Sequence, residues 1–211
     1  MQGRYAHLNL RWNPFGEATP EERGALAHVD VEPFRQYITP VCAVELRADH
    51  GRGKSTTLLA LRHTLAPKAP LYRGRQQHSE PLPVAAWVFL DEVQHIPVFK
   101  LWQFARRMRA HQGIIIYSTH ANRRWLFKLA GFSTQKHVID YAQPEMLLAL
   151  FKKRIAWAHN HQGPTPQIHP KDIQQLSILY DDDIRSMEGH LYDCINRLKS
   201  PEQPIVPRST V

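Results

Sequence analysis

Two short, continuous apolar runs constrain the fold of this chain more than any other feature. One is "VAAWVFL" at residues 84–90, and the other is the "IIIY" stretch that follows Gly113. Runs of this length without polar alternation are typical of strands buried on both faces of a parallel sheet. A helical pattern at residues 98–112 separates them, as a crossover between parallel strands requires. The sequence therefore predicts an α/β fold built on a parallel sheet.

The rest of the chain extends this pattern and then changes character. Further core elements are expected as a strand at 41–46, a helix at 54–65, an edge strand near 71–72, a short helix at 121–132 and a strand at 136–142. After these come three helical segments, at 144–160, 171–179 and 183–198. We therefore expect an α/β core with an N-terminal arm at 1–142, a helical lid at 143–199 and a flexible tail at 200–211.

Composition limits the possible classes of protein. No apolar run approaches the ~20 residues that a membrane span needs, and two distant cysteines among 211 residues form no disulfide framework. These features favour a cytoplasmic protein that does not enter the membrane. The net charge is +8 with a pI near 9.7, a balance that favours contact with polyanions, usually nucleic acid.

A glycine-rich loop, "ADHGRGKS" at residues 48–55, follows the first strand and opens the helix at 54–65. Such a loop cradles phosphates with backbone N–H groups, while its lysine reaches the β- and γ-phosphates and its serine hydroxyl binds Mg²⁺. Alanine stands where the pattern has its leading glycine, which is tolerated if φ stays negative. The residues expected to bind the nucleotide here are Ala48, Asp49, His50, Gly51, Arg52, Gly53, Lys54, Ser55 and Thr56.

A pair of acids ends the buried strand "WVFLDE" at residues 87–92. Ligands bind at the carboxyl edge of open parallel sheets, where this strand would deliver both carboxylates. We expect Asp91 and Ser55 to hold Mg²⁺, and Glu92 to orient and polarise the water that attacks ATP. Together, the loop and the acid pair predict an enzyme that hydrolyses ATP.

The next buried strand ends in "YSTH", residues 117–120. A polar side chain on this strand is expected to lie between the carboxylates and the γ-phosphate. Ser118 and Thr119 both fit this position, and Thr119 is preferred as the catalytic residue. His120 is a weaker candidate.

With these motifs and the helical lid, residues 10–199 resemble the AAA+ ATPases. The stretch "DDDIRSMEGHLYD", residues 181–193, is similar to the second-sensor helix of bacterial replication-initiator ATPases. The resemblance implies that Arg185 reaches the bound nucleotide from the lid, where a planar cation would report on the γ-phosphate.

The stretch "LRWNPFGE", residues 10–17, is similar to the opening of secretion and transposition helper ATPases. In those proteins the segment folds over the adenine, which implies that Trp12 and Phe15, with Pro14, cover the base here. An arginine finger and ring assembly stay open, because no arginine lies in a motif that matches. The candidates for a finger are Arg106, Arg107, Arg109, Arg123 and Arg124.

Two partners stay open for such a switch. The favoured hypothesis is an ATPase that acts on DNA without reading its sequence, or on a DNA-bound partner, through some of the basic residues Arg106, Arg107, Arg109, Arg123, Arg124, Lys128, Lys152, Lys153 and Arg154. The alternative is a protein-remodelling or regulatory ATPase subunit with a protein client and no direct contact to nucleic acid, and a homo-oligomer fits either. A small-molecule phosphotransferase is disfavoured by the acid pair and the lid arginine. An ABC-type ATPase is disfavoured because the chain lacks a Leu-Ser-Gly-Gly signature.

Overall fold

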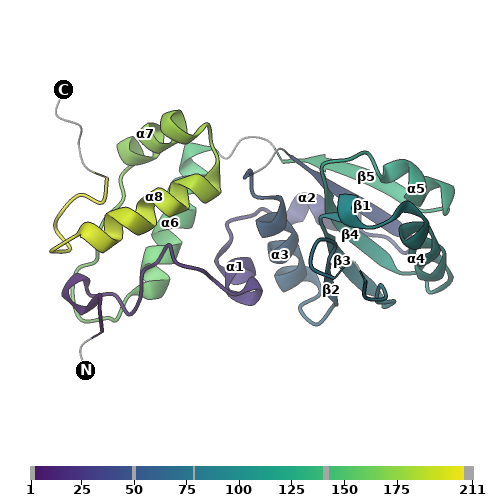
Figure 1. The fold of residues 1–211 in the computed structure, drawn as a ribbon, viewed down its shortest axis with the longest axis horizontal. Coiled ribbons are helices and arrows are strands. Elements are labelled where there is room, and N and C mark those ends of the chain that lie inside the picture. The colour runs from purple at the N-terminus through teal and green to yellow at the C-terminus, as the bar shows by residue number, and fades with distance from the viewer. Residues whose placement is uncertain (1–2, 49–50, 78, 140–142, 207–211) are drawn as a thin grey trace. The chain divides into compact units, whose positions relative to one another are not determined.

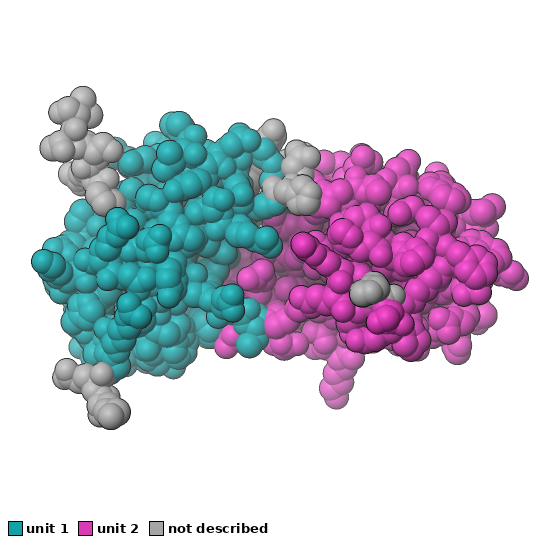
Figure 2. Space-filling view, in the orientation of Figure 1, with its two compact units in different colours: residues 1–19, 50–52, 141–211 teal, residues 20–49, 53–140 magenta. Residues whose placement is uncertain are grey.

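The computed structural model describes residues 3–48, 51–77, 79–139 and 143–206. The chain forms two compact units, which Figure 2 colours separately. We call residues 20–49 and 53–140 the α/β unit, and residues 1–19, 50–52 and 141–211 the helical unit. Each unit has hydrophobic clusters of its own.

A parallel sheet of five strands, in the order β2-β3-β4-β1-β5, forms the centre of the α/β unit. This confirms the fold class expected from the two apolar runs, which lie in the adjacent strands β3 and β4. The strand β4 also lies between β1 and β3, so it separates the strand before the glycine-rich loop from the strand that ends in the acid pair. The strands are β1 (Cys42–Arg47), β2 (Leu71–Arg73), β3 (Trp87–Asp91), β4 (Ile114–Thr119) and β5 (Ser133–Val138).

Helices cover both faces of this sheet (Figure 1). The helix α3 (Lys54–Leu65), which has the bounds that the sequence predicted, shares one cluster with Phe34 of α2 (Glu32–Arg35) and the apolar side chains of β1. On the other face, α4 (Val98–Ala110) and α5 (Arg124–Leu129) share a cluster with residues of β3 and β4. The short helix α1 (Pro20–Leu26) packs on α3, and a 3₁₀ turn, η2 (Val93–His95), follows β3.

The edge strand β5 differs from its prediction, because it begins at Ser133 and not at residue 136. Its first half, "STQ", is mostly exposed and carries no apolar pattern, and its pairing with β1 alone defines it. An edge strand with polar side chains is stabilised by ladder hydrogen bonds and not by burial, so hydrophobic periodicity does not reveal it. Residues 140–142 of the predicted strand lie outside the described residues.

The helical unit contains α6 (Pro144–Ala158), α7 (Pro170–Tyr180), α8 (Ile184–Arg197) and the 3₁₀ turn η1 (Ala6–Leu8). The three long helices are those expected from the sequence. Asp183 caps α8, because its carboxylate accepts hydrogen bonds from the N–H groups of Arg185 and Ser186. Among the helices described, none combines the length and the hydropathy that a bilayer span needs.

The N-terminal arm is grouped with these helices and not, as the sequence analysis had it, with the α/β core. Tyr5, Leu8, Leu10 and Phe15 are buried in the same cluster as the apolar faces of the helices. The Tyr5 hydroxyl also donates a hydrogen bond to Asn196 Oδ1 at 2.7 Å. Apolar side chains spaced irregularly along an arm predict no partner, so only the tertiary structure reveals the surface that buries them.

The segment after α8 is also partly packed. Ile205 and Val206 are only 1% and 2% exposed and belong to the cluster of the helical unit. These two positions are therefore packed in the core of the helical unit, within the segment where a flexible tail was expected. Two apolar residues are too few to give a periodic pattern, yet they are enough to fill a site in a core. The tail at 207–211 lies outside the described residues.

Candidate active site

The glycine-rich loop leads into α3 with a backbone suited to an anion. Gly53 is the N-cap of α3 with φ 81°, a left-handed conformation that glycine adopts without strain. Because glycine has no side chain, it caps none of the N–H groups of the first turn, which begins with Lys54, Ser55 and Thr56. Such N–H groups, at the positive end of a helix dipole, bind phosphate.

The middle of the loop does not belong to the described part of the α/β unit. Asp49 and His50 lie outside the described residues. Gly51, with φ 75°, and Arg52 are grouped with the helical unit. The described loop residues that belong to the α/β unit are therefore Ala48 and those from Gly53 onward.

Lys54 lies within the loop and is only 8% exposed. Its ammonium group donates a hydrogen bond to the carbonyl oxygen of Ala48, with 2.8 Å between Nζ and O. Ala48 is not among the described residues with positive φ. Alanine at the leading position therefore meets the condition that the sequence analysis set for tolerating it.

Three elements meet at the Asp91 carboxylate. Ser55, in the first turn of α3, donates a hydrogen bond from Oγ to Asp91 Oδ1 at 3.1 Å. Ser118, at the end of β4, donates a hydrogen bond to the same oxygen. The loop, the acid pair and the polar strand end thus converge at one edge of the sheet, as the parallel topology predicts.

The oxygen atoms of Ser55 and Asp91 fit Mg²⁺, which takes oxygen ligands and keeps part of its shell for water and substrate phosphates. Within the described part of the chain, no group of three or more His, Cys, Asp and Glu side chains could hold a metal ion. A pair of oxygen donors next to a phosphate-binding turn suits an ion that the protein shares with a phosphorylated substrate.

Ser118, and not the preferred Thr119, is the residue beside Asp91. The Thr119 hydroxyl is buried and occupied in a turn, where it accepts from the N–H of Ala121 at 3.0 Å and donates to the carbonyl of Ala121 at 2.9 Å. Successive side chains of a strand point to opposite faces, so only one of the two can reach the carboxylate. The weaker candidate, His120, donates its backbone N–H to Gln94 Oε1 at 3.4 Å.

Glu92 has an unusual backbone conformation, with φ 56° and ψ 49°. The left-handed region is uncommon for a residue with a long side chain, and it costs of order 1 kcal/mol or more. A hydrogen bond from the Glu92 N–H to Ser118 Oγ, at 2.8 Å, holds it there. The backbone of Gly74 also lies against the Glu92 carbonyl oxygen, so close that a Cβ added to Gly74 would be 2.5 Å from this oxygen.

Gly74 therefore supports the site, although sequence reasoning missed it. Its N–H also donates to the carbonyl of Asp91 at 2.8 Å, so the backbone after β2 lies directly against the acid pair. The only signal in the sequence is a glycine directly after a short edge strand, which marks a close backbone approach as readily as a turn.

A buried polar pair lies inside the sheet behind this edge. Glu45 of β1 is opposite Tyr117 of β4, and the Tyr117 hydroxyl donates to Glu45 Oε2 at 3.0 Å. Burial, reinforced by the Glu45 carboxylate, raises the pKa of Tyr117 above its ordinary value. Tyr117 therefore stays a neutral donor, and the carboxylate of Glu45 is satisfied within the core.

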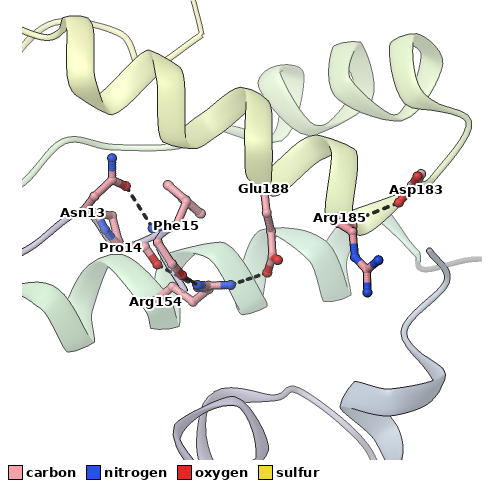
Figure 3. Close-up of polar contacts among 8 residues, drawn as sticks. Asn13, Pro14, Phe15, Arg154, Asp183, Arg185 and Glu188 are labelled. Carbon is pink, nitrogen blue, oxygen red and sulfur yellow. Dashed lines mark hydrogen bonds and ion pairs between the residues drawn. The ribbon is translucent and has the colours of Figure 1, made fainter. Parts of the chain in front are cut away.

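The candidates in the helical unit differ in how accessible they are. Arg185 lies in the first turn of α8 and is exposed, and Figure 3 draws its guanidinium extending away from the helix. Trp12 is 36% exposed and contacts the ring of Trp157 edge-on. Phe15 is 5% exposed and packs against Phe151, so its ring is not available to cover a base without leaving the core.

Arg154 is not a surface cation, which corrects its place among the phosphate-tracking candidates. It is buried, and it donates hydrogen bonds to the carbonyl oxygens of Pro14 and Gly16, at 2.7 and 2.8 Å, and to the Glu188 carboxylate (Figure 3). Its role is to hold the N-terminal arm on α6 and α8. In a sequence, an arginine or lysine is expected to lie on the surface. Only the tertiary structure reveals that a cationic side chain such as that of Arg154 is buried.

The candidate arginine fingers differ in whether their guanidinium groups bond to the backbone. Arg109 donates to the carbonyl oxygen of Gly131 and so joins the end of α4 to the turn after α5. Arg123 lies near Gln94, with 3.5 Å from Nη2 to the carbonyl oxygen. Arg106 and Arg107 are exposed on α4, as is Arg109, but only for Arg109 is a hydrogen bond to a backbone carbonyl described above.

Comparisons with known proteins identify no family for this chain. No family model matches the chain, and no curated protein sequence matches it. Among solved structures, a variant of RuvB from Thermotoga maritima is similar over 90% of this chain and 66% of its own, with a TM-score of 0.48 and 12% sequence identity. The chain thus spans slightly less than two thirds of that protein's length. Similarity at this level supports no statement about activity.

Proposed function

We propose that this protein is a nucleotide-dependent switch of the AAA+ type, which binds ATP with Mg²⁺ and hydrolyses it. One observation carries the proposal: the Ser55 hydroxyl, in the turn that opens α3, lies 3.1 Å from the Asp91 carboxylate at the end of β3. A phosphate-binding turn and an acidic strand end that share a hydrogen bond are the two halves of a P-loop hydrolase site.

Each residue of this cluster has a proposed role. The N–H groups that follow Gly53 and the ammonium group of Lys54 bind the phosphates, while Ser55 and Asp91 hold the metal ion. Mg²⁺ supplies neutralisation of the charge on the phosphates when it is bound. The carboxylate of Glu92 orients the attacking water and accepts its proton. Ser118 positions the other groups through its hydrogen bonds to the Asp91 carboxylate and the Glu92 N–H.

The helical unit is proposed to respond to the nucleotide. Arg185 is the proposed sensor, because its exposed guanidinium would favour the extra charge of a γ-phosphate. Trp12 is the proposed contact to the base, since its ring is partly exposed on the arm whereas the Phe15 ring is buried.

Two partners suit such a switch. The net charge of +8 favours nucleic acid bound without sequence readout. A protein client is the second candidate, and it is favoured by an apolar surface at the end of α7, where Ile178 and Leu179 are 86% and 59% exposed.

Three measurements test the proposal. Lys54→Ala should abolish ATP binding in a fluorescent-nucleotide titration, because the phosphates lose their cation. Glu92→Gln should bind ATP normally but lower turnover by about 100-fold or more, as expected for loss of a general base.

Addition of single-stranded or duplex DNA should raise the rate of ATP hydrolysis by the wild-type protein, and a rise in salt concentration should remove this increase steeply. Unchanged turnover in Glu92→Gln would remove this glutamate from the mechanism, and full binding in Lys54→Ala would contradict the site.

A further inference from the structure

The positive charge of this protein is concentrated in one continuous part of the chain. Residues 93–139 contain eight Lys and Arg and no Asp or Glu. Subtracting these eight from the 27 Lys and Arg of the whole chain leaves 19, which equals the number of Asp and Glu. The entire net charge of +8 therefore lies in α4, β4, α5 and β5 and the turns that join them.

Aromatic rings lie among these charges on the outer face of α4. Phe99 is 66% exposed, and its ring stacks on Trp102 with 6.2 Å between centroids and 25° between planes. The guanidinium of Arg106 lies over Trp102, with 5.1 Å from Cζ to the ring centroid. The positions 99, 102 and 106 follow the helical repeat, so Phe99, Trp102 and Arg106 form one stripe of three planar groups.

The residues around this stripe leave it on the outer side of α4. The opposite face of the helix is buried in the core through Leu101, Phe104, Ala105 and Met108. Arg107 and Gln103 are exposed on the same helix. The helix α5 contacts α4 and also presents a ring beside a cation, with Trp125 49% exposed and Lys128 exposed.

We infer that the outer face of α4, formed by Phe99, Trp102, Arg106 and Arg107, binds single-stranded nucleic acid. The arginines would contact phosphates and release counterions, while the rings would stack with bases. Unpaired bases are needed for such stacking, so a single strand is favoured over a duplex. The segment that carries α4 and α5, residues 93–139, also contains no Asp or Glu that would repel a polyanion. The inference depends on the proposed function only for its biological role, because the binding itself requires no nucleotide.

The test measures fluorescence anisotropy of a labelled oligothymidylate strand with the full chain, without ATP. Arg106→Glu with Arg107→Glu should weaken binding by about tenfold or more and reduce the slope of log K against log salt by about 1.4, as for two lost contacts to a single strand. Phe99→Ala should weaken binding by about tenfold, as for one lost stacking partner. Because Phe99 is mostly exposed, its removal leaves the core intact. Trp102→Phe, which keeps a ring, should retain most of the affinity.

The matched control is Lys152→Glu with Lys153→Glu, an adjacent pair of exposed cations on α6 with the same change of charge. It should change affinity much less than the α4 pair. Equal losses from the two pairs would mean that only overall charge matters, and would overturn the assignment to α4. Equal affinity for a duplex, with no effect of Phe99→Ala, would overturn the stacking role. Displacement of the strand by polyglutamate at equal charge concentration would indicate an acidic protein partner and overturn the nucleic-acid assignment.

The two proposals fail separately. Lys54→Ala should lose ATP binding and still bind the strand, because α4 lies outside the nucleotide site. A wild-type protein that hydrolyses ATP but leaves the anisotropy unchanged would overturn this inference and leave the ATPase standing. A protein that binds the strand but does not hydrolyse ATP would overturn the proposed ATPase and leave this inference standing.

Discussion

At the scale of the residue, Ser118 and Glu92 show how closely this site is assembled. The Ser118 hydroxyl donates to Asp91 and accepts from the Glu92 N–H, so one side chain holds both acids. Glu92 in turn keeps a left-handed backbone that most residues avoid. Strain of this kind persists where the surrounding structure enforces it, and it is concentrated at functional sites.

Ser118→Ala is expected to lower the ATP turnover number by about 10- to 100-fold, since it frees both the carboxylate of Asp91 and the turn at Glu92. Thr119→Val is its matched control. It should cost about 1 kcal/mol of unfolding free energy, for the lost turn contact with Ala121, and leave turnover nearly unchanged. Steady-state ATPase assays with thermal melts of both variants check this. The opposite pattern, with turnover lost only in Thr119→Val, would return the catalytic role to Thr119.

Glu92→Asn is expected to raise the free energy of unfolding by about 0.5–1 kcal/mol, because asparagine tolerates the left-handed region better than glutamate. Glu92→Gln removes the same charge but keeps a long side chain, so its stability should stay near the wild-type value. Urea unfolding of the three proteins gives the comparison. Equal stability of the two variants would show that the backbone at this position stores no strain.

At the scale of the element, the arm and α6 are joined by one buried cation. Arg154 binds two backbone carbonyls of the arm and the Glu188 carboxylate of α8, with side-chain exposures of 6% and 22% for the ion pair. Because these partners come from two segments that are distant in the chain, the arm and α8, Arg154 on α6 fixes the arm against the proposed sensor helix. Removal of one partner from a buried pair leaves the other charge uncompensated.

Arg154→Met is therefore expected to destabilise the helical unit by about 3 kcal/mol. Lys152→Met, an exposed position two residues earlier on α6, should stay within about 0.5 kcal/mol of wild type. Chemical unfolding followed by tryptophan fluorescence, to which the contacting rings of Trp12 and Trp157 in the helical unit contribute, measures both. A loss in Arg154→Met as small as that in Lys152→Met would mean that the arm is held by its apolar contacts alone.

At the scale of the whole molecule, the two units have separate cores. The clusters of the α/β unit contain no residue of the helical unit, and the cluster of the helical unit contains no residue of the sheet. A cluster that is complete within one part of the chain predicts that this part can fold alone.

Residues 20–140 expressed alone should accordingly unfold in one cooperative transition and give dispersed amide resonances. The chain of 211 residues is the reference, and its transition should contain a second component from the helical unit. A fragment that binds hydrophobic dyes and melts without cooperativity would mean that the sheet requires the helical unit for its stability.

The parallel sheet, the helix of residues 54–65 and the three helices of the helical unit could all be predicted from the sequence, because continuous apolar runs and helical periodicity are local signals that survive without tertiary information. The same holds for the positions of Lys54, Ser55 and Asp91, whose motifs are tied to the ends of a strand and a helix.

Tertiary structure alone decided which of two adjacent hydroxyl residues reaches Asp91, that Gly74 supports the acid pair, and that Arg154, Phe15 and Ile205 are buried. Each of these outcomes depends on a contact between residues far apart in the chain. The type of a residue is the same whether its side chain is buried or exposed, so no local sequence pattern distinguishes a buried position from an exposed one. The sequence determined the elements and the residue types at the edge of the sheet, and packing determined which of those residues meet.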